Sequence, residues 1–154
     1  MNSIIASRPM NFFERVTANV FPCFINLAID IEDPKVIPDY LEIIKRNSPP
    51  FYMKADKENL YRFANAKFPI HNIPETITDL KDSIVWSLKN CPATGSDPLA
   101  TVAVNSHKIV LNYCHSFFSG AMLMHVVNEI QNPSNLEKPI FPLTIEETYP
   151  LHEI

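Results

Sequence analysis

Residues 112–130 read NYCHSFFSGAMLMHVVNEI, and this stretch decides the fold. Its beginning continues the apolar run of residues 109–114, whose β-branched and aromatic residues favour a strand. From Gly120 onward apolar residues fall on most sides at helical spacing, which predicts a helix over residues 120–130 that is buried against a sheet. His115 therefore stands between a strand and a helix. Gly120, one of only two glycines in the chain, can open the turn between them.

The same kinds of pattern predict the remaining helices and strands of the chain. Two hairpins are expected, over residues 51–55 with 60–64 and over residues 99–104 with 109–114. Residues 23–31 alternate with the period of a strand, and residues 68–74 are extended between prolines. Three more helices are expected over residues 12–19, from Asp33 or Pro38 to residue 47, and over residues 78–90 with Thr78 or Asp79 as cap.

This order of elements predicts an α/β (α+β) fold, in which helices pack on a mixed, largely antiparallel sheet. Residues 131–154 carry four prolines and have no helical period, so we interpret them as an extended tail or crossover segment. The expected organisation is one domain over residues 1–130, followed by this proline-containing segment.

The composition excludes several classes of protein. The chain has 154 residues, 46% of them hydrophobic and 19% charged, which is typical of one soluble globular domain. The net charge is −4 and the basic residues are scattered, which argues against nucleic-acid binding because neutralisation of phosphates dominates it. Gly95 and Gly120 stand alone, so neither a P-loop nor a Rossmann fingerprint is present.

The cysteines and histidines do not form a recognisable metal motif. Cys23, Cys91 and Cys114 are an odd number without CxxC spacing, which predicts neither a disulfide framework nor a zinc site. The five histidines are far apart in sequence, so we expect no bound metal. No apolar run reaches the roughly 18 residues of a membrane span, and the first residues do not predict a secretory signal. The sequence favours a reducing, cytoplasmic location.

His115 is the candidate catalytic residue. A residue at the end of a strand is held by the sheet and still faces a loop region, which suits a general base. An imidazole with a pKa near 6.5 can take a proton from a hydroxyl, an amine or a thiol at neutral pH. From the residues alone, an ordinary residue at the end of a strand is favoured over a catalytic one.

The residues around His115 resemble the CoA-dependent acyltransferase superfamily, which includes chloramphenicol acetyltransferase, the alcohol acyltransferases and the condensation domains of peptide synthetases. That family places the motif His-x-x-x-Asp-Gly between a strand and an apolar helix. Here it reads His115-Ser-Phe-Phe-Ser119-Gly120, followed by AMLMHVVNEI. The similarity extends over about residues 8–129 and covers the order of elements in the N-terminal half of such enzymes.

The resemblance implies a specific chemistry. His115 would act as general base while an alcohol or amine attacks an acyl thioester, and the thiol of CoA or of a carrier would leave. No cofactor would be resident, because the acyl-CoA or acyl-carrier thioester is a co-substrate. The implied partners are a small-molecule acyl acceptor and a second half-domain or a further copy of the chain.

The motif departs from the family at two positions. Ser119 replaces the Asp whose carboxylate braces the site, and a serine before a helix is also a preferred N-cap. Cys114 stands where condensation domains often have a second His, and no basic neighbour in sequence lowers its thiol pKa, which favours a buried strand residue.

The family is built from two similar halves with a tunnel between them, and no motif of a second half follows here. The sequence therefore supports two hypotheses, an incomplete or degenerate acyltransferase and a non-catalytic interaction module that retains the half-fold. In either case the inner wall of the tunnel would expose apolar surface.

Overall fold

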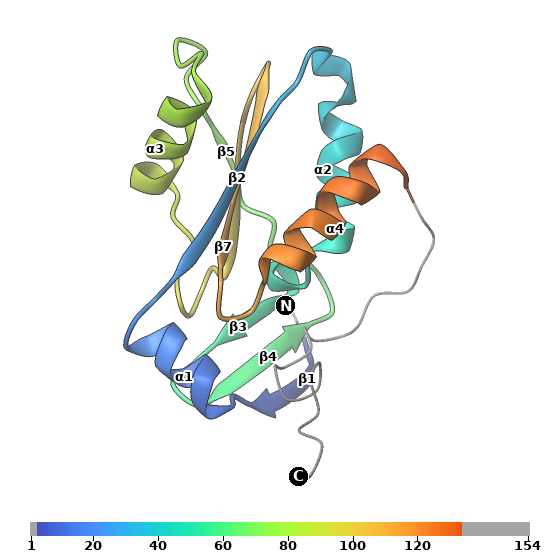
Figure 1. The fold of residues 1–154 in the computed structure, drawn as a ribbon. Helices are drawn as coiled ribbons and strands as arrows, with labels where there is room; N and C mark the ends of the chain where they lie inside the picture. Colours follow the sequence, from blue (N-terminus) through green and yellow to red (C-terminus); the bar gives the residue numbers. More distant parts are fainter. Residues whose placement is uncertain (1–2, 134–154) are drawn as a thin grey trace, which may run out of the picture.

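The computed structural model describes residues 3–133, which form two sheets with helices packed beside them (Figure 1). The strands are β1 (Ile4–Pro9), β2 (Phe24–Asp30), β3 (Met53–Ala55), β4 (Asn59–Phe63), β5 (Ile70–Asn72), β6 (Ala100–Asn105) and β7 (Lys108–Cys114). The helices are α1 (Phe12–Asn19), α2 (Ile37–Asn47), α3 (Leu80–Asn90) and α4 (Gly120–Gln131), with 3-10 turns at Pro34–Val36 and Pro49–Tyr52.

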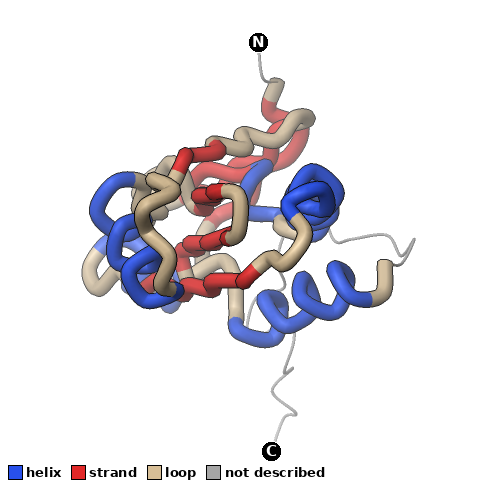
Figure 2. Tube along the Cα trace, turned by 90° about the horizontal axis from the view of Figure 1, so that it is seen from above, coloured by secondary structure: helices blue, strands red, loops and turns tan. Residues whose placement is uncertain are grey.

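The larger sheet has the strand order β2-β7-β6-β5. Its first three strands are antiparallel neighbours, and β5 pairs with β6 in parallel. Helix α3 covers one face of this sheet, while α2 and α4 cover the other (Figures 1 and 2). A smaller antiparallel sheet has the order β1-β4-β3. The predicted fold class, a mixed and largely antiparallel sheet with packed helices, is confirmed.

Strand β7 forms the centre of the core, because all seven of its residues are buried. Its side chains alternate between the two faces of the sheet. Leu111 and Tyr113 lie in the main apolar cluster with residues of α2 and α4, whereas Val110 faces the cluster beneath α3. The strand that leads into the predicted site is therefore fixed on both faces.

A buried polar network ties α3 to β7. The side-chain amide nitrogen of Asn112 donates to Ser87 Oγ on α3 at 2.7 Å and to Thr101 Oγ1 on β6 at 3.0 Å. Its amide oxygen accepts from Asn26 Nδ2 on β2 at 2.7 Å. Asn112 is fully buried, so these bonds satisfy an amide that would otherwise be strongly unfavourable there.

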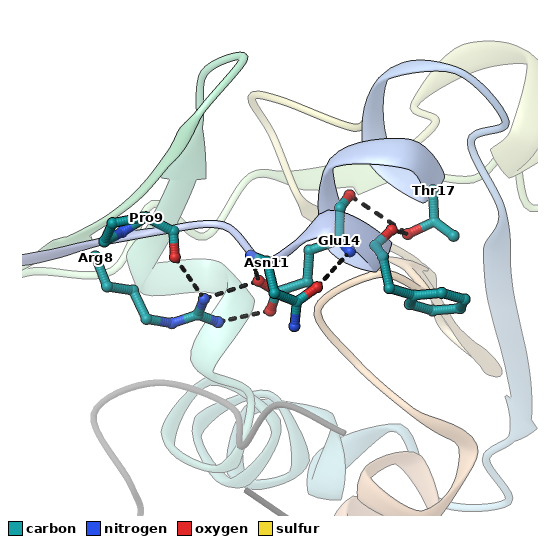
Figure 3. Close-up of polar contacts among 6 residues, drawn as sticks. Arg8, Pro9, Asn11, Glu14 and Thr17 are labelled. Atoms are coloured by element: carbon teal, nitrogen blue, oxygen red, sulfur yellow. Dashed lines mark hydrogen bonds and ion pairs between the residues drawn. The ribbon is translucent and has the colours of Figure 1, made fainter. Parts of the chain in front are cut away.

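The entry into α1 is fixed by a capping box (Figure 3). Asn11 Oδ1 accepts from the Glu14 backbone N–H at 2.8 Å, and a Glu14 carboxylate oxygen accepts from the Asn11 N–H at 3.0 Å. The guanidinium of Arg8, on β1, donates to both oxygens of the same carboxylate at 2.8 and 2.6 Å. The buried carboxylate of Glu14 thus joins the end of β1 to the first turn of α1.

Most predicted elements are confirmed, and the differences concern pairing over long sequence distances. Strand β1 was not expected, and its pairing with β4 creates the second sheet. The extended segment 68–74 contains β5, whose parallel pairing was also not expected. The helix signalled at Asp33 begins as a 3-10 turn that Asp33 caps, and α2 starts only at Ile37. Helix α4 is buried along one face only, because Met124 and Asn128 are exposed.

The predicted tail, residues 131–154, lies outside the described residues from residue 134 onward. The division into a domain over residues 1–130 and a following segment therefore stays a prediction.

Replacing Asn112 with Ala should lower the free energy of unfolding by about 2–4 kcal/mol, because it leaves several buried polar groups without partners. Urea unfolding followed by circular dichroism measures the change. As a control, Asn90→Ala removes an exposed amide that donates to the Trp86 carbonyl and should change stability by less than about 0.5 kcal/mol. Equal effects of the two substitutions would contradict this role of Asn112.

Candidate functional site

His115 lies one residue beyond the end of β7, as predicted, and its side chain is exposed. Its backbone N–H donates to the Cys23 carbonyl at 2.8 Å, which continues the pairing of β7 with β2 by one residue. Within the described part of the chain the imidazole has no hydrogen-bond partner, so its nitrogens are accessible to a substrate. The backbone of this residue is held while its ring remains available.

Aromatic packing fixes the chain on both sides of His115. The rings of Tyr113 and Phe118 stack with centroids 4.1 Å apart and an interplanar angle of 20°. Phe51 contacts the Tyr113 ring edge-on at 5.8 Å, and the Tyr113 hydroxyl and Ser48 Oγ share a hydrogen bond of 2.8 Å. Complete burial raises the pKa of Tyr113, so it is a neutral structural anchor. The turn that carries His115 is therefore clamped to the core at its two ends.

Ser119 is the N-cap of α4, and its Oγ accepts from the Met122 backbone N–H at 3.3 Å. A capping serine satisfies one of the free N–H groups of the first helical turn. This structural role explains Ser119 without any chemistry at the site, and the residue contributes no charge to replace the family's carboxylate.

Gly120 is not required by the local backbone. It is the first residue of α4, its φ is not positive, and an added Cβ would be 3.8 Å from Ile25 Cδ1, an ordinary contact. The expectation that this glycine opens the turn is therefore not supported. Gly95, interpreted as a simple turn residue, is the constrained one, because a Cβ there would overlap the carbonyl group of Ala18.

Cys114 is buried in the cluster with Met10, Leu60, Leu99 and Phe117. Burial raises the pKa of its thiol, with a smaller opposing effect of Ser116. This environment agrees with an inert strand residue. It gives no sign of a second catalytic group at this position of the motif.

Cys23 is a residue of this site that the sequence did not identify. It is exposed, and its carbonyl is the acceptor of the His115 N–H. The two residues face each other across the β2–β7 ladder, although they are 92 positions apart in sequence. Only the register of the two strands reveals this neighbour, because no local pattern links residue 23 to residue 115.

A cavity lies elsewhere in the molecule. It has a volume of about 780 Å³ and is formed by α2 and residues 64–70, with Leu41, Lys45, Tyr52 and Phe68 in its wall. None of the motif residues lines it. The exposed side chain of His115 is therefore not part of this cavity.

No metal site is evident in residues 3–133, where no three His, Cys, Asp or Glu side chains are grouped as ligands. In the same residues no helix is long and apolar enough to cross a bilayer.

Comparison with known proteins relates the chain to one group of structures. No family model matches the sequence, and no curated protein matches it either. The condensation domain of the Monacolin K polyketide synthase MokA superposes with a TM-score of 0.56 at 12% identity, over 88% of this chain and 36% of its own. The chain has the fold of part of a condensation domain. For holo T3CT the TM-score is 0.60 at 15% identity, over 89% of this chain and 36% of the other.

A third structure with this condensation-domain fold is the cyclization-docking bidomain of EpoB from Sorangium cellulosum. It matches with a TM-score of 0.53 at 10% identity, over 92% of this chain and 34% of its own. The chain thus spans about a third of the length of these structures, which corresponds to one half-domain. The predicted resemblance to a half of this acyltransferase fold is confirmed at the level of structure, and the roles of the site residues stay predictions.

Cys23 should react with N-ethylmaleimide at neutral pH while Cys91 and Cys114 stay unmodified. The reason is that Cys23 is exposed, whereas burial raises the thiol pKa of the other two and shields them. Mass spectrometry of the intact, folded protein should show one adduct, and Cys23→Ser should show none. Labelling of Cys114 before unfolding would contradict the buried position of this strand residue.

Replacing Ser119 with Ala should lower the free energy of unfolding by about 1 kcal/mol, because α4 loses its N-cap. Ser119→Asp should retain the cap and leave stability nearly unchanged, since Asp caps as well as Ser. Thermal unfolding of the two variants measures the difference. If Ser119→Ala and Ser119→Asp unfold at the same temperature, the cap does not explain this residue.

Proposed function

We propose that this chain is an acyltransferase-like protein that transfers an acyl group from a CoA or carrier thioester to an alcohol or amine. The observation that carries the proposal is an exposed imidazole, fixed at the end of the central strand, in the fold of a condensation domain. The clamp of Tyr113 and Phe118 around His115 supports it, because a general base must be held in one position relative to its substrate.

In the proposed reaction His115 removes the proton from the acceptor hydroxyl or amine as that group attacks the thioester carbonyl carbon. The new bond joins the acceptor oxygen or nitrogen to the acyl carbon, and the carbon–sulfur bond breaks. The imidazolium then returns the proton to the departing thiolate. The thioester is consumed as a co-substrate, so the proposal needs no resident cofactor and no metal.

The reaction also needs a partner that encloses the substrates. Several large apolar side chains on α1 and in the turn after it are exposed, above all Phe12 at 75% and Phe21 at 72%. Exposed apolar surface of this kind is typical of an interaction site. We propose that a second half-domain or another copy of the chain completes the site and excludes water from it.

The location of this reaction in a reducing cytoplasm is part of the proposal. It is supported by the three cysteines at positions 23, 91 and 114, which are all free thiols.

The second candidate function is a non-catalytic interaction module. It is favoured by Ser119, which caps α4 and supplies no carboxylate to brace His115. An interaction module would keep the fold and the exposed apolar surface, and it would bind its partner without acyl transfer.

His115→Ala should reduce acyl transfer from acetyl-CoA to a panel of alcohols and amines by at least about a hundredfold, since general-base catalysis contributes roughly 10²–10⁴-fold. The acylated products are measured by mass spectrometry, which avoids interference from the protein's own thiols. His107→Ala is the matched control, because His107 is also exposed but lies in the turn between β6 and β7.

Unchanged transfer by His115→Ala would rule out His115 as the base. Absence of transfer by the folded wild-type chain, alone and with added partner, would favour the interaction module.

A further inference from the structure

Strand β2 forms one edge of the larger sheet, with β7 on its inner side. The Ile31 N–H donates to the His107 carbonyl at 2.7 Å, and the His115 N–H donates to the Cys23 carbonyl. Because hydrogen-bonded pairs alternate along an antiparallel ladder, residues 25, 27 and 29 also bond to β7. The backbone N–H and C=O groups of residues 24, 26, 28 and 30 must therefore point outward.

No described residue accepts from or donates to these outward backbone groups. The edge runs for seven residues, FINLAID, without a proline, a lysine or a break in register. Such an unprotected edge is a template for pairing with another strand. Helices α3 and α4 lie on opposite faces of the sheet beside this edge (Figures 1 and 2).

The other three sheet edges in the described chain are short or irregular strands, whereas β2 is a regular strand of seven residues whose nearest proline, Pro22, lies outside it. The edge strand β1 contains a register shift between Ile4 and Ala6 and ends in Pro9. The edge strand β3 has three residues and includes Lys54, and the three-residue β5 lies between Pro69 and Pro74. Short strands, bulges, prolines and lysines all prevent edge pairing, so the contrast singles out β2.

We propose that the free edge of β2 pairs with β2 of a second copy of the chain, antiparallel and centred on Leu27. In this register Phe24 faces Asp30 of the second copy and Asn26 faces its Ala28. All outward-pointing residues of β2 then form hydrogen-bonded pairs across the interface. A second copy presents the same edge and the same half-buried row of Ile25, Leu27 and Ile29, so a two-fold axis at Leu27 pairs every outward backbone group and joins the two apolar rows.

The side chains support the same register. Ile25, Leu27 and Ile29 share the face of the sheet that carries the main apolar cluster, and all three are only half-buried at this edge. In the proposed dimer Leu27 lies against its own copy, and Ile25 lies against Ile29 of the other chain. The two apolar rows then form one continuous strip, which removes their exposed surface from water. This pairing does not depend on whether His115 is catalytic.

The test is sedimentation velocity of the full chain over a wide concentration range, compared with two variants at one position. Ala28→Pro removes an outward N–H and leaves the bonds of β2 to β7 intact, so the strand should still form. It should weaken dimerisation at least about tenfold, because hydrogen bonds are lost on both sides of the axis. Ala28→Ser keeps the N–H and is the matched control that should dimerise like wild type. Circular dichroism verifies the fold of each.

Disulfide trapping tests the register without relying on proline. In a Cys23→Ser background, Leu27→Cys should form an intermolecular disulfide under mild oxidation, because Cα atoms of a non-hydrogen-bonded pair are about 4.5 Å apart. Ile25→Cys and Ile29→Cys should not, since each faces the other residue in the second copy.

Three results would overturn the proposal. The first is a wild-type protein that stays monomeric at every concentration. This includes a monomer in which hydrogen exchange shows the backbone amides of Asn26 and Ala28 to be protected, because a segment of the same chain then covers the edge. The second is a dimer that Ala28→Pro does not weaken. The third is trapping at residue 25 or 29 that is as fast as at residue 27.

Discussion

Strand β7 is paired on both sides and buried along its whole length, and the rest of the larger sheet is arranged around it. One face of the strand presents Asn112, whose hydrogen bonds reach β2, β6 and α3. The other face presents Tyr113, which is stacked on Phe118 and bonded to Ser48. Two adjacent residues thus fix both helical layers to the same strand, one by polar contacts and the other by aromatic packing.

The position of His115 follows from this constraint. The chain leaves the sheet directly after Cys114, but Phe118 returns to the core and packs on Tyr113. The residues between them are confined to a short turn, and the backbone bond to Cys23 holds the first of these. An imidazole on such a turn combines exposure with a defined position, which is the combination that the proposed general base requires. The motif positions 119 and 120 contribute to the start of α4 and not to the geometry of the ring.

Local patterns in the sequence were sufficient to predict most helices and strands. They were insufficient to predict which of these elements lie next to one another. The helix over residues 12–19, the two hairpins and the cap at Asp79 were predictable because each depends on residues within one or two turns of chain. Strand β1 was missed because its partner strand, β4, is at least 50 positions away, and Cys23 was missed for the same reason. Gly95 shows this limit of sequence-based prediction most directly. A side chain at position 95 would overlap the backbone carbonyl of Ala18, which is distant in sequence. A sequence pattern cannot report a contact that exists only after the sheets have formed.

The exposed and the buried apolar residues of this half-fold have separate roles. The cluster around Tyr113, Phe51 and Phe118 is closed by α2 and α4 and contains fully buried side chains, so it does not need another chain for its stability. Phe12, Phe13 and Phe21 lie outside that cluster, on α1 and the turn after it, and more than half of each side chain is exposed. A partner that covered them would add little to the packing around β7. In the proposed function, a partner on this surface would act on access to the His115 ring and on the exclusion of water, because the core already fixes the strand and turn of His115. Folding of the chain and enclosure of the proposed site would then depend on different surfaces of the molecule.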